Sequence, residues 1–405
     1  MVFLSQSGLR KDFQYSLGVG AGDKVFVSAR GLMSEAKEFG APAKGALVKR
    51  WRTIAEHMSV LTNAHSTAED KANALSSLEI AAAGLYNDLF NLTGNGPTAE
   101  EVLANALEKA HREKRTLWIE VSGWAKDLPW ELLRVPSSIS PLKRDCWLGE
   151  VAIVSGARAV SNVGGKNVIR VNGPPTIISV LGDETMEADQ PEAEYPSIAT
   201  RGELRPLEYI AVEREFIQGL RATGRDYVFV GPLDESNRAA ARAELRRHFG
   251  REQPYQVIHF ACHGDVAESE EDEFEAFVRT NNFRLTKQDF NDQPRIRFNH
   301  PNIAFLNMCN GLTASSLPAG GMAAYFDRST KSEAIIASAF LIDDRSAAAI
   351  TEGLLDKMLP PKIGRGAAIG RALFEVRNEL LSRQESLTGF CYRLLGDADL
   401  FILRA

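Results

Sequence analysis

Two apolar segments of the sequence end beside residues that could do nucleophilic chemistry. One begins at Val257 and leads to His263, and the other begins at Ile303 and leads to Cys309. An ordinary cysteine thiol, with a pKa of about 8.5, is only a few per cent thiolate at neutral pH. A neighbouring imidazole raises the reactive fraction and can later protonate a leaving amine. The pair therefore predicts acyl transfer with Cys309 as the nucleophile and His263 as its general base.

The residues beside this pair suggest how the reaction would be stabilised. Gly264 follows the histidine directly, and its missing side chain leaves room for a substrate backbone. The backbone N–H groups of Gly264 and Cys309 are the candidate donors to a developing oxyanion. No third residue that would orient His263 stands out, so the sequence predicts a catalytic dyad. No metal and no organic cofactor is implied.

Three aspartates near these residues suggest a substrate preference. Asp265 lies two residues beyond His263, and Asp343 and Asp344 follow the next apolar segment after Cys309. A carboxylate in a partly desolvated pocket pairs well with a guanidinium group. These acids therefore predict Arg or Lys on the N-terminal side of the scissile bond. If they face solvent instead, a small or apolar residue would be accepted there.

The segments that must position these residues alternate in type after Pro175. Apolar runs typical of strands alternate with amphipathic runs typical of helices. The expected strands are 176–181, 226–230, 256–261, 302–307 and 333–339, and the expected helices are 207–222, 237–249, 346–358 and 366–383. This rhythm predicts an α/β fold whose mostly parallel sheet carries helices on both faces. Function collects beyond the carboxyl ends of such strands, so we expect His263 and Cys309 at one edge of the sheet.

The first part of the chain is predicted to be largely helical. Strands are expected over 13–19 and 24–28, helices over 43–61, 66–92 and 98–112, and two further strands over 116–122 and 151–154. The patterns over 43–61 and 66–92 predict a helical hairpin, with a capping box from Ser66 to Glu69 at the start of its second helix. Residues 160–175 are rich in Gly, Asn and Val, which suits a connection between two lobes.

Ordered motifs give the sequence from about residue 80 to its end a resemblance to a known family. They are Leu128-Pro-Trp-Glu-Leu-Leu, Leu148-Gly-Glu, Val257-Ile-His-Phe-Ala-Cys-His-Gly, Leu306-Asn-Met-Cys-Asn-Gly, Ile336-Ala-Ser-Ala-Phe-Leu-Ile-Asp-Asp and Leu394-Leu-Gly-Asp-Ala-Asp-Leu. This set resembles the CHAT domain, a bacterial branch of the caspase and separase clan. The 46 residues from His263 to Cys309 are close to the roughly 50 that separate the pair in caspases. Where the family commonly has Ser-Ala-Cys-Glu-Thr-Gly, this chain keeps the nucleophile but changes the loop around it.

The resemblance implies a cysteine endopeptidase that makes limited cuts in a protein substrate. It implies a caspase-like catalytic lobe over residues 176–405, preceded by a smaller inactive α/β lobe over 91–175. It also implies control by another protein or a signal, as in an effector of bacterial defence. The N-terminal helical segment, residues 1–90, is then the candidate region for contact with an activating partner.

Other interpretations of the same residues stay open. Cys262 adjoins His263, but neighbouring strand residues point to opposite faces, so we expect Cys262 to pack against a helix. His259 is expected to lie below the site. Zinc could in principle be bound by His259, Cys262, His263 and Cys309, but strand alternation turns Cys262 away from the two histidines. The functional alternatives are a catalytically silent scaffold with the same fold and a different acyl transferase with the same dyad.

The composition excludes several classes of protein. With 405 residues, 44% hydrophobic and 25% charged, the chain has the make-up of a soluble globular protein. A net charge of -6 and the lack of a basic stripe argue against direct nucleic-acid binding. No apolar run approaches the roughly 18 residues of a membrane span, and the start lacks a signal-peptide pattern. Four scattered cysteines predict reduced thiols, so we expect a cytoplasmic protein.

Overall fold

The computed structural model of this chain describes most of the residues that the sequence analysis singles out. The described residues are 16–21, 25–29, 37–39, 44–63, 66–90, 97–123, 126, 128–157, 167–182, 207, 209–231, 233, 237–250, 254–268, 274–280, 283–286, 289, 298, 300–308, 323, 326, 332–340, 342–384 and 386–405. For 16–21, 25–29, 37–39, 44, 123, 263–268, 274–280, 284 and 384 only the backbone is described. Cys309 lies outside the described residues.

The chain forms two compact units. The first comprises Met1–Asn167 with Ala368–Asp399, and the second comprises Val168–Ala367 with Leu400–Ala405. The predicted division at residues 90 and 175 concerns functional parts of the chain and stays a prediction.

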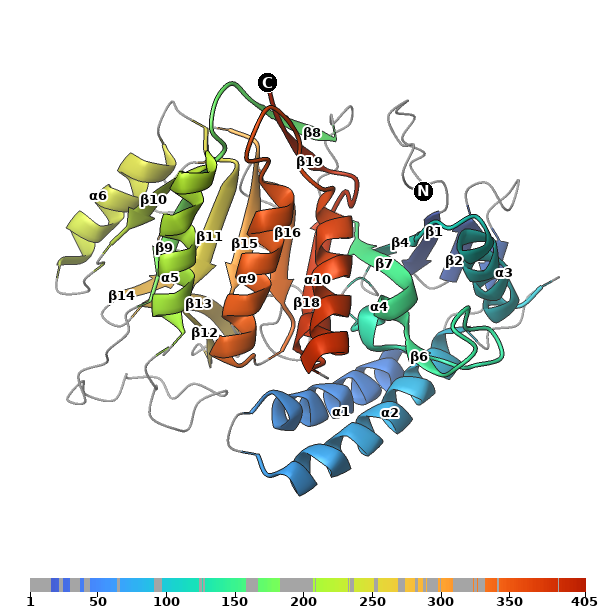
Figure 1. The fold of residues 1–405 in the computed structure, drawn as a ribbon. Helices are drawn as coiled ribbons and strands as arrows, with labels where there is room; N and C mark the ends of the chain where they lie inside the picture. Colours follow the sequence, from blue (N-terminus) through green and yellow to red (C-terminus); the bar gives the residue numbers. More distant parts are fainter. Residues whose placement is uncertain are drawn as a thin grey trace. The chain divides into compact units, whose positions relative to one another are not determined.

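The second unit contains the strands that lead to His263 and Cys309. Its main strands are β9 (Thr176–Leu181), β10 (Asp226–Val230), β11 (Val257–Ala261), β15 (Asn302–Asn307) and β16 (Ser332–Ser338). They lie in the order β10-β9-β11-β15-β16, and each neighbouring pair is parallel (Figure 1). Every residue of β11 and β15 is buried, which explains why both segments are nearly continuous apolar runs.

Helices cover both faces of these strands. They are α5 (Ile210–Gly219), α6 (Arg238–Phe249) and α9 (Asp344–Met358). Phe249 of α6 contacts Phe260 of β11, with 6.2 Å between ring centroids. The neighbouring His259 faces the other way, toward Glu213 of α5, and α5 and α9 lie side by side on that face (Figure 1). The predicted fold class, α/β with a mostly parallel sheet between helices, is confirmed.

An antiparallel sheet that the sequence analysis did not predict begins at His263. It consists of β12 (His263–Glu268), β13 (Phe274–Thr280) and β14 (Phe283–Thr286), in that order. A single residue, Cys262, separates β11 from β12. A third small sheet in this unit joins β8 (Val168–Val171), β19 (Phe401–Arg404) and β17 (Gly364–Arg365).

The first unit also combines strands and helices. Its strands are β1 (Ser16–Ala21), β2 (Val25–Ala29), β3 (Lys37–Phe39), β4 (Leu117–Gly123), β5 (Arg134–Val135), β6 (Cys146–Trp147), β7 (Ala152–Gly156) and β18 (Tyr392–Gly396). Its helices are α1 (Lys44–Thr62), α2 (Ala68–Phe90), α3 (Ala99–Arg112), α4 (Leu148–Val151) and α10 (Ile369–Gln384). The main strands lie in the order β18-β7-β4-β1-β2-β3, parallel from β18 to β1 and antiparallel beyond.

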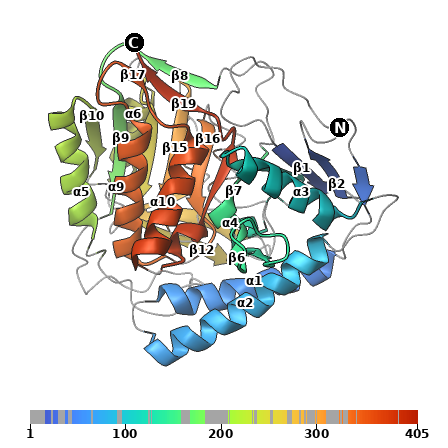
Figure 2. The same cartoon turned by 45° about the vertical axis from the view of Figure 1, so that its right-hand side comes forward.

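The predicted helical hairpin is α1 and α2, which pack along each other, and α3 contacts β2 (Figure 2). The capping box at the start of α2 was placed one residue too early. Thr67 and Asp70 exchange the side-chain-to-backbone bonds that were expected of Ser66 and Glu69. At α3 the box forms between Thr98 and Glu101, in the segment that predicted the start of that helix.

Candidate active site

The register of β11 and β15 ends these two parallel strands at one edge of the sheet, a short distance in sequence before the two predicted catalytic residues. The strands are parallel neighbours, and Ala261 lies opposite Asn307 as their last pair. His263 follows Ala261 by two residues, and Cys309 follows Asn307 by two residues. Positions 263 and 309 are therefore each two residues in sequence beyond the same pair of facing residues. The side chains of His263 and Cys309 are not described, so their roles stay a prediction.

The predicted oxyanion residue Gly264 and the predicted substrate residue Asp265 lie on β12, opposite Val278 and Phe277 of β13.

The other two aspartates bond to helix ends. Asp343 is the N-cap of α9 and accepts a hydrogen bond from the N–H of Ser346 at 2.8 Å. Asp344 accepts from the N–H of Tyr209, the N-cap residue of α5, at 3.2 Å. Both carboxylates therefore contribute to holding α5 and α9, and a role in binding substrate stays a prediction.

A buried polar cluster that the sequence analysis missed lies directly before these strand ends. Thr351 Oγ1 of α9 donates to Glu213 Oε1 of α5 at 2.6 Å. Asn307 Nδ2 donates to the same Oε1 and to Thr351 Oγ1, the latter at 2.8 Å. All three residues are buried. The last residue of β15 is thus tied to both helices on one face of the sheet.

His259 extends the cluster across β11 to β9. Its Nδ1 is 2.8 Å from Ser179 Oγ, and its Nε2 is 3.9 Å from Glu213 Oε2. Neither Nε2 nor Oε2 has a hydrogen-bond partner. The structure thus places His259 in the interior, in contact with polar residues.

Burial keeps the members of this cluster uncharged. It lowers the pKa of His259 to about 3. It raises the pKa of Glu213 to about 8, against the opposite effect of the hydrogen bonds from Thr351 and Asn307. At neutral pH the imidazole is therefore neutral and the carboxyl group is mostly protonated.

The described cysteines are all buried and free of disulfides: Cys146, Cys262 and Cys391. Burial, and secondarily Glu213, raises the pKa of the Cys262 thiol. This residue is therefore poorly suited to act as a nucleophile, and its burial agrees with the predicted packing role.

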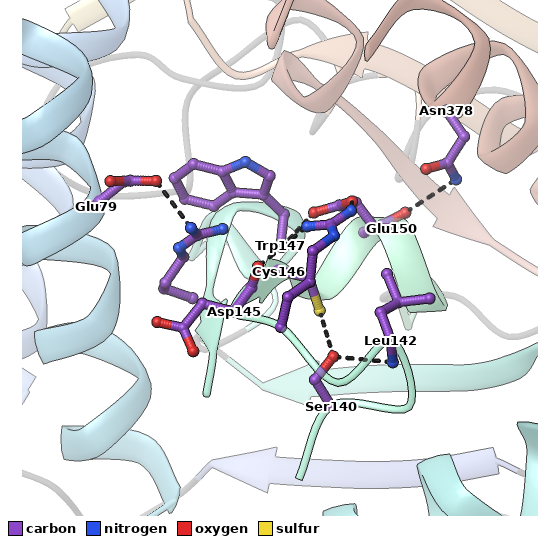
Figure 3. Close-up of polar contacts among 11 residues, drawn as sticks. Glu79, Ser140, Leu142, Asp145, Cys146, Trp147, Glu150 and Asn378 are labelled. Atoms are coloured by element: carbon purple, nitrogen blue, oxygen red, sulfur yellow. Dashed lines mark hydrogen bonds and ion pairs between the residues drawn. The ribbon is translucent and has the colours of Figure 1, made fainter. Parts of the chain in front are cut away.

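Cys146 lies in a tightly bonded segment of the first unit (Figure 3). Its Sγ is 3.1 Å from Ser140 Oγ, which also accepts from the N–H of Leu142 at 3.2 Å. An ion pair of 2.9 Å between Arg134 and Glu79 joins the same segment to α2. Burial raises the pKa of the Cys146 thiol. These contacts fit a structural cysteine.

No group of three or more His, Cys, Asp or Glu residues in the described part of the chain is arranged to hold a metal ion. The zinc interpretation stays untested, because it includes the side chains of His263 and Cys309. Within the same described part, no helix combines the length and the hydropathy that a membrane span requires.

The parallel sheet and the helices on its faces define the class of fold, α/β, and the comparisons with known proteins give its family. The family model described as CHAT domain matches residues 87–387, and the chain belongs to that family. No curated protein matches the chain by sequence.

The structures of a separase–securin complex have a similar fold. The separase–securin complex of Saccharomyces cerevisiae matches with a TM-score of 0.52 and 10% identity, over 97% of this chain and 30% of that chain. A second structure of that complex matches with a TM-score of 0.50. The Arg-specific cysteine proteinase gingipain R matches with a TM-score of 0.43 and 14% identity, over 89% of this chain and 77% of that chain. The chain thus spans about 30% of the separase chain that it matches, and the likeness confirms the caspase-like fold.

One of the motifs that carry the family resemblance contributes a buried acid to the first unit. Glu131, from the motif that starts at Leu128, is 1% exposed and lies between Arg377 and Arg393. Its two carboxylate oxygens are 3.6 and 3.5 Å from their nearest guanidinium nitrogens. Arg393 directly precedes the closing motif, which begins at Leu394. Glu131 therefore joins its motif to the residue before the closing motif through a buried ion cluster.

Proposed function

We propose that this chain is a cysteine endopeptidase that makes limited cuts in a protein substrate. The observation that carries the proposal is the register of β11 and β15, which leads to His263 and Cys309 at equal offsets from the pair Ala261 and Asn307. Membership of the CHAT-domain family and the caspase-like fold support it.

In the proposed reaction, His263 takes the thiol proton of Cys309 as the sulfur attacks the scissile carbonyl carbon. The N–H groups of Gly264 and Cys309 stabilise the resulting oxyanion. His263 then protonates the leaving amine, which leaves a thioester on Cys309. Water, deprotonated by His263, hydrolyses that thioester and restores the free thiol.

The remaining cysteines support the choice of nucleophile. Cys146, Cys262 and Cys391 are buried, and burial raises the pKa of the first two thiols. A thiolate forms readily only where a positive charge or an imidazole favours it and solvent or substrate can reach it. Cys309 is the cysteine that the motif order and the strand register favour.

The proposed setting is a regulated effector of bacterial defence in the cytoplasm, activated by a protein partner. Residues 1–86 precede the region that matches the family, and they include α1 and most of α2. On α2, Leu75 is 39% exposed and Ile80 is 72% exposed. The α1–α2 hairpin lies largely outside the region that matches the family, so it is the proposed surface for the activator. Direct nucleic-acid binding is not expected.

The decisive experiment compares cells that express the wild-type chain with cells that express Cys309→Ala. New protein N-termini that appear only with the wild-type chain identify the substrate, and His263→Ala should abolish them as well. Cys262→Ala is the matched control and should keep them. Wild-type levels of cleavage by Cys309→Ala would refute the proposal. A chain that shows no cleavage and no labelling of Cys309 by a peptide electrophile would be the silent scaffold.

A further inference from the structure

The cluster around Glu213 joins five elements at the point where the two catalytic strands end. Each of them contributes one side chain: Ser179 from β9, Glu213 from α5, His259 from β11, Asn307 from β15 and Thr351 from α9. All five side chains are buried. The elements β9, β11, β15, α5 and α9 are labelled in Figure 1. The cluster therefore connects strands on which the proposed reaction depends.

The hydrogen bonds show where a proton on Glu213 would lie. Oε1 accepts from both Thr351 and Asn307, so it acts as the carbonyl oxygen. Oε2 has no partner and lies 3.9 Å from His259 Nε2, which also has none. That gap is longer than a hydrogen bond and too short for a bridging water, which needs a hydrogen-bond length on each side.

One proton on Oε2 would satisfy both of these atoms. A small shift of either side chain brings Oε2–H into hydrogen-bond range of His259 Nε2, which then acts as the acceptor. His259 Nδ1 must in that case carry the ring proton and donate to Ser179 Oγ, 2.8 Å away. An ionised Glu213 would require the other tautomer of His259, in which Nε2–H faces Oε2 and Nδ1 accepts from Ser179 Oγ. That arrangement buries a carboxylate without a counter-charge, so the neutral acid is favoured.

We propose that Glu213 is a positioning residue of the active site. As a neutral acid it fixes Asn307, and through Asn307 it holds the end of β15 that leads to Cys309 in place beside the end of β11. This inference rests on the proposed function. A displacement of about 1 Å at a nucleophile is enough to lower a rate by about 100-fold, so an anchor two residues away can control the rate without touching substrate.

A carboxylate at Glu213 would accept more strongly from Asn307 and Thr351, but ionisation would destabilise the cluster as a whole, because burial and the acidic groups around it disfavour a negative charge. The titratable groups around it are Asp344 and Glu352 on α9, His259 on β11, and Cys262, which follows β11. The side chains from β9 and β15 are neutral. In the described part of the chain no lysine or arginine pairs with Glu213, and His259 is neutral at neutral pH, so a carboxylate there has no counter-charge.

The test uses the full chain with Glu213→Ala, Glu213→Gln and the control Glu215→Gln, which alters an exposed acid on the same helix. The first readout is the rate at which chloroacetamide alkylates Cys309 between pH 6 and 9.5, with Cys309→Ala as the blank. The second is kcat and KM on the cleaved substrate over the same pH range. Far-ultraviolet circular dichroism checks that each variant is folded.

Glu213→Ala should lower kcat and the alkylation rate by about 10- to 100-fold, with little change in KM. Glu213→Gln should rescue most of this loss, since its amide can still accept from Asn307 and donate to His259. It should also remove a decline in wild-type kcat that sets in near pH 8. Glu215→Gln should match the wild type throughout.

A folded Glu213→Ala chain with wild-type kcat and alkylation would overturn the positioning role. If Glu213→Ala does not fold, the Glu213→Gln profile decides, because an unchanged alkaline decline in that variant contradicts the inference. Failure of the proposed function gives a different pattern. No variant would then cleave any substrate, while the alkylation rates would still report whether Glu213 positions Cys309.

Discussion

The pair formed by Glu213 and His259 predicts an unusual dependence of folding stability on pH. The pKa of Glu213 rises from 4.5 in the unfolded chain to about 8 in the folded chain. Between these values the folded chain holds a proton that the unfolded chain has lost. The stabilising contribution of the neutral acid is therefore complete below pH 4.5 and is lost as the pH rises toward 8.

His259 gives the opposite slope. Its pKa falls from 6.5 in the unfolded chain to about 3 in the folded chain, so its contribution is complete above pH 6.5 and is lost as the pH falls toward 3. The two slopes cancel between pH 4.5 and 6.5. A shift of one pKa unit corresponds to about 1.4 kcal/mol, so the pair lowers the unfolding free energy of the wild type by about 2 kcal/mol between pH 6.5 and 8.

The variant Glu213→Gln isolates the acid, because all other titrations are common to both chains. The unfolding free energy of the wild type minus that of the variant should fall by about 1.4 kcal/mol per pH unit, and by at most about 5 kcal/mol in all. Urea unfolding at five pH values between 4.5 and 8.5 measures this difference, with Glu215→Gln as the control. Parallel pH profiles for the wild type and Glu213→Gln would show that Glu213 titrates normally, and the reasoning about burial would be wrong.

Three other outcomes are expected. Glu131→Gln should destabilise the chain by about 3–5 kcal/mol, because two buried arginines lose their counter-charge. Glu79→Gln, which breaks the more exposed pair with Arg134, should cost at most about 1 kcal/mol, so equal shifts in thermal unfolding would contradict the argument. Cys262→Ala should lose roughly 1 kcal/mol of stability and keep its turnover, and alkylation of Cys262 in place of Cys309 would reverse the assignment. Profiling of a peptide library should show a preference for Arg or Lys before the scissile bond, whereas a preference for aspartate would refute the role of the acidic residues.

The parallel strands were predictable from the sequence because both of their faces are buried. Such strands appear as unbroken apolar runs, and the runs at 257–261 and 302–307 required no knowledge of distant residues. The antiparallel sheet from β12 to β14 was not predicted. In the sequence the acidic run 268–273 follows His263 and suggests a solvated loop, and the pairing of the sheet joins residues whose local patterns are weak.

The cluster around Glu213 was missed for a related reason. Asn307 lies 94 residues from Glu213, and Thr351 lies 138 residues from it, so only the folded chain brings them together. A local signal was nevertheless present. Ile210, Glu213 and Ile217 have the spacing of one helix face, which placed the acid on the buried side of α5. Asn307 likewise interrupts an apolar strand. A polar residue inside an apolar pattern was the available sign of a buried network.

That network also bears on why the strands adopt this register rather than another. Strand side chains alternate between faces, so a slip of β15 by one residue would turn Asn307 away from α5 and α9. Glu213 and Thr351 would then lose their shared partner in a site without solvent, at a cost of about 1–3 kcal/mol for each unsatisfied group. A uniformly apolar strand would impose no such penalty, since Phe, Leu and Ile can pack on either face. A free-energy difference of 1.4 kcal/mol between two registers changes their populations about tenfold, so the polar contacts favour the observed register. In that register Ala261 is paired with Asn307, and positions 263 and 309 each follow one of these residues by two. The same buried residues thus specify the strand pairing and, under the proposed function, the alignment of the nucleophile with its base.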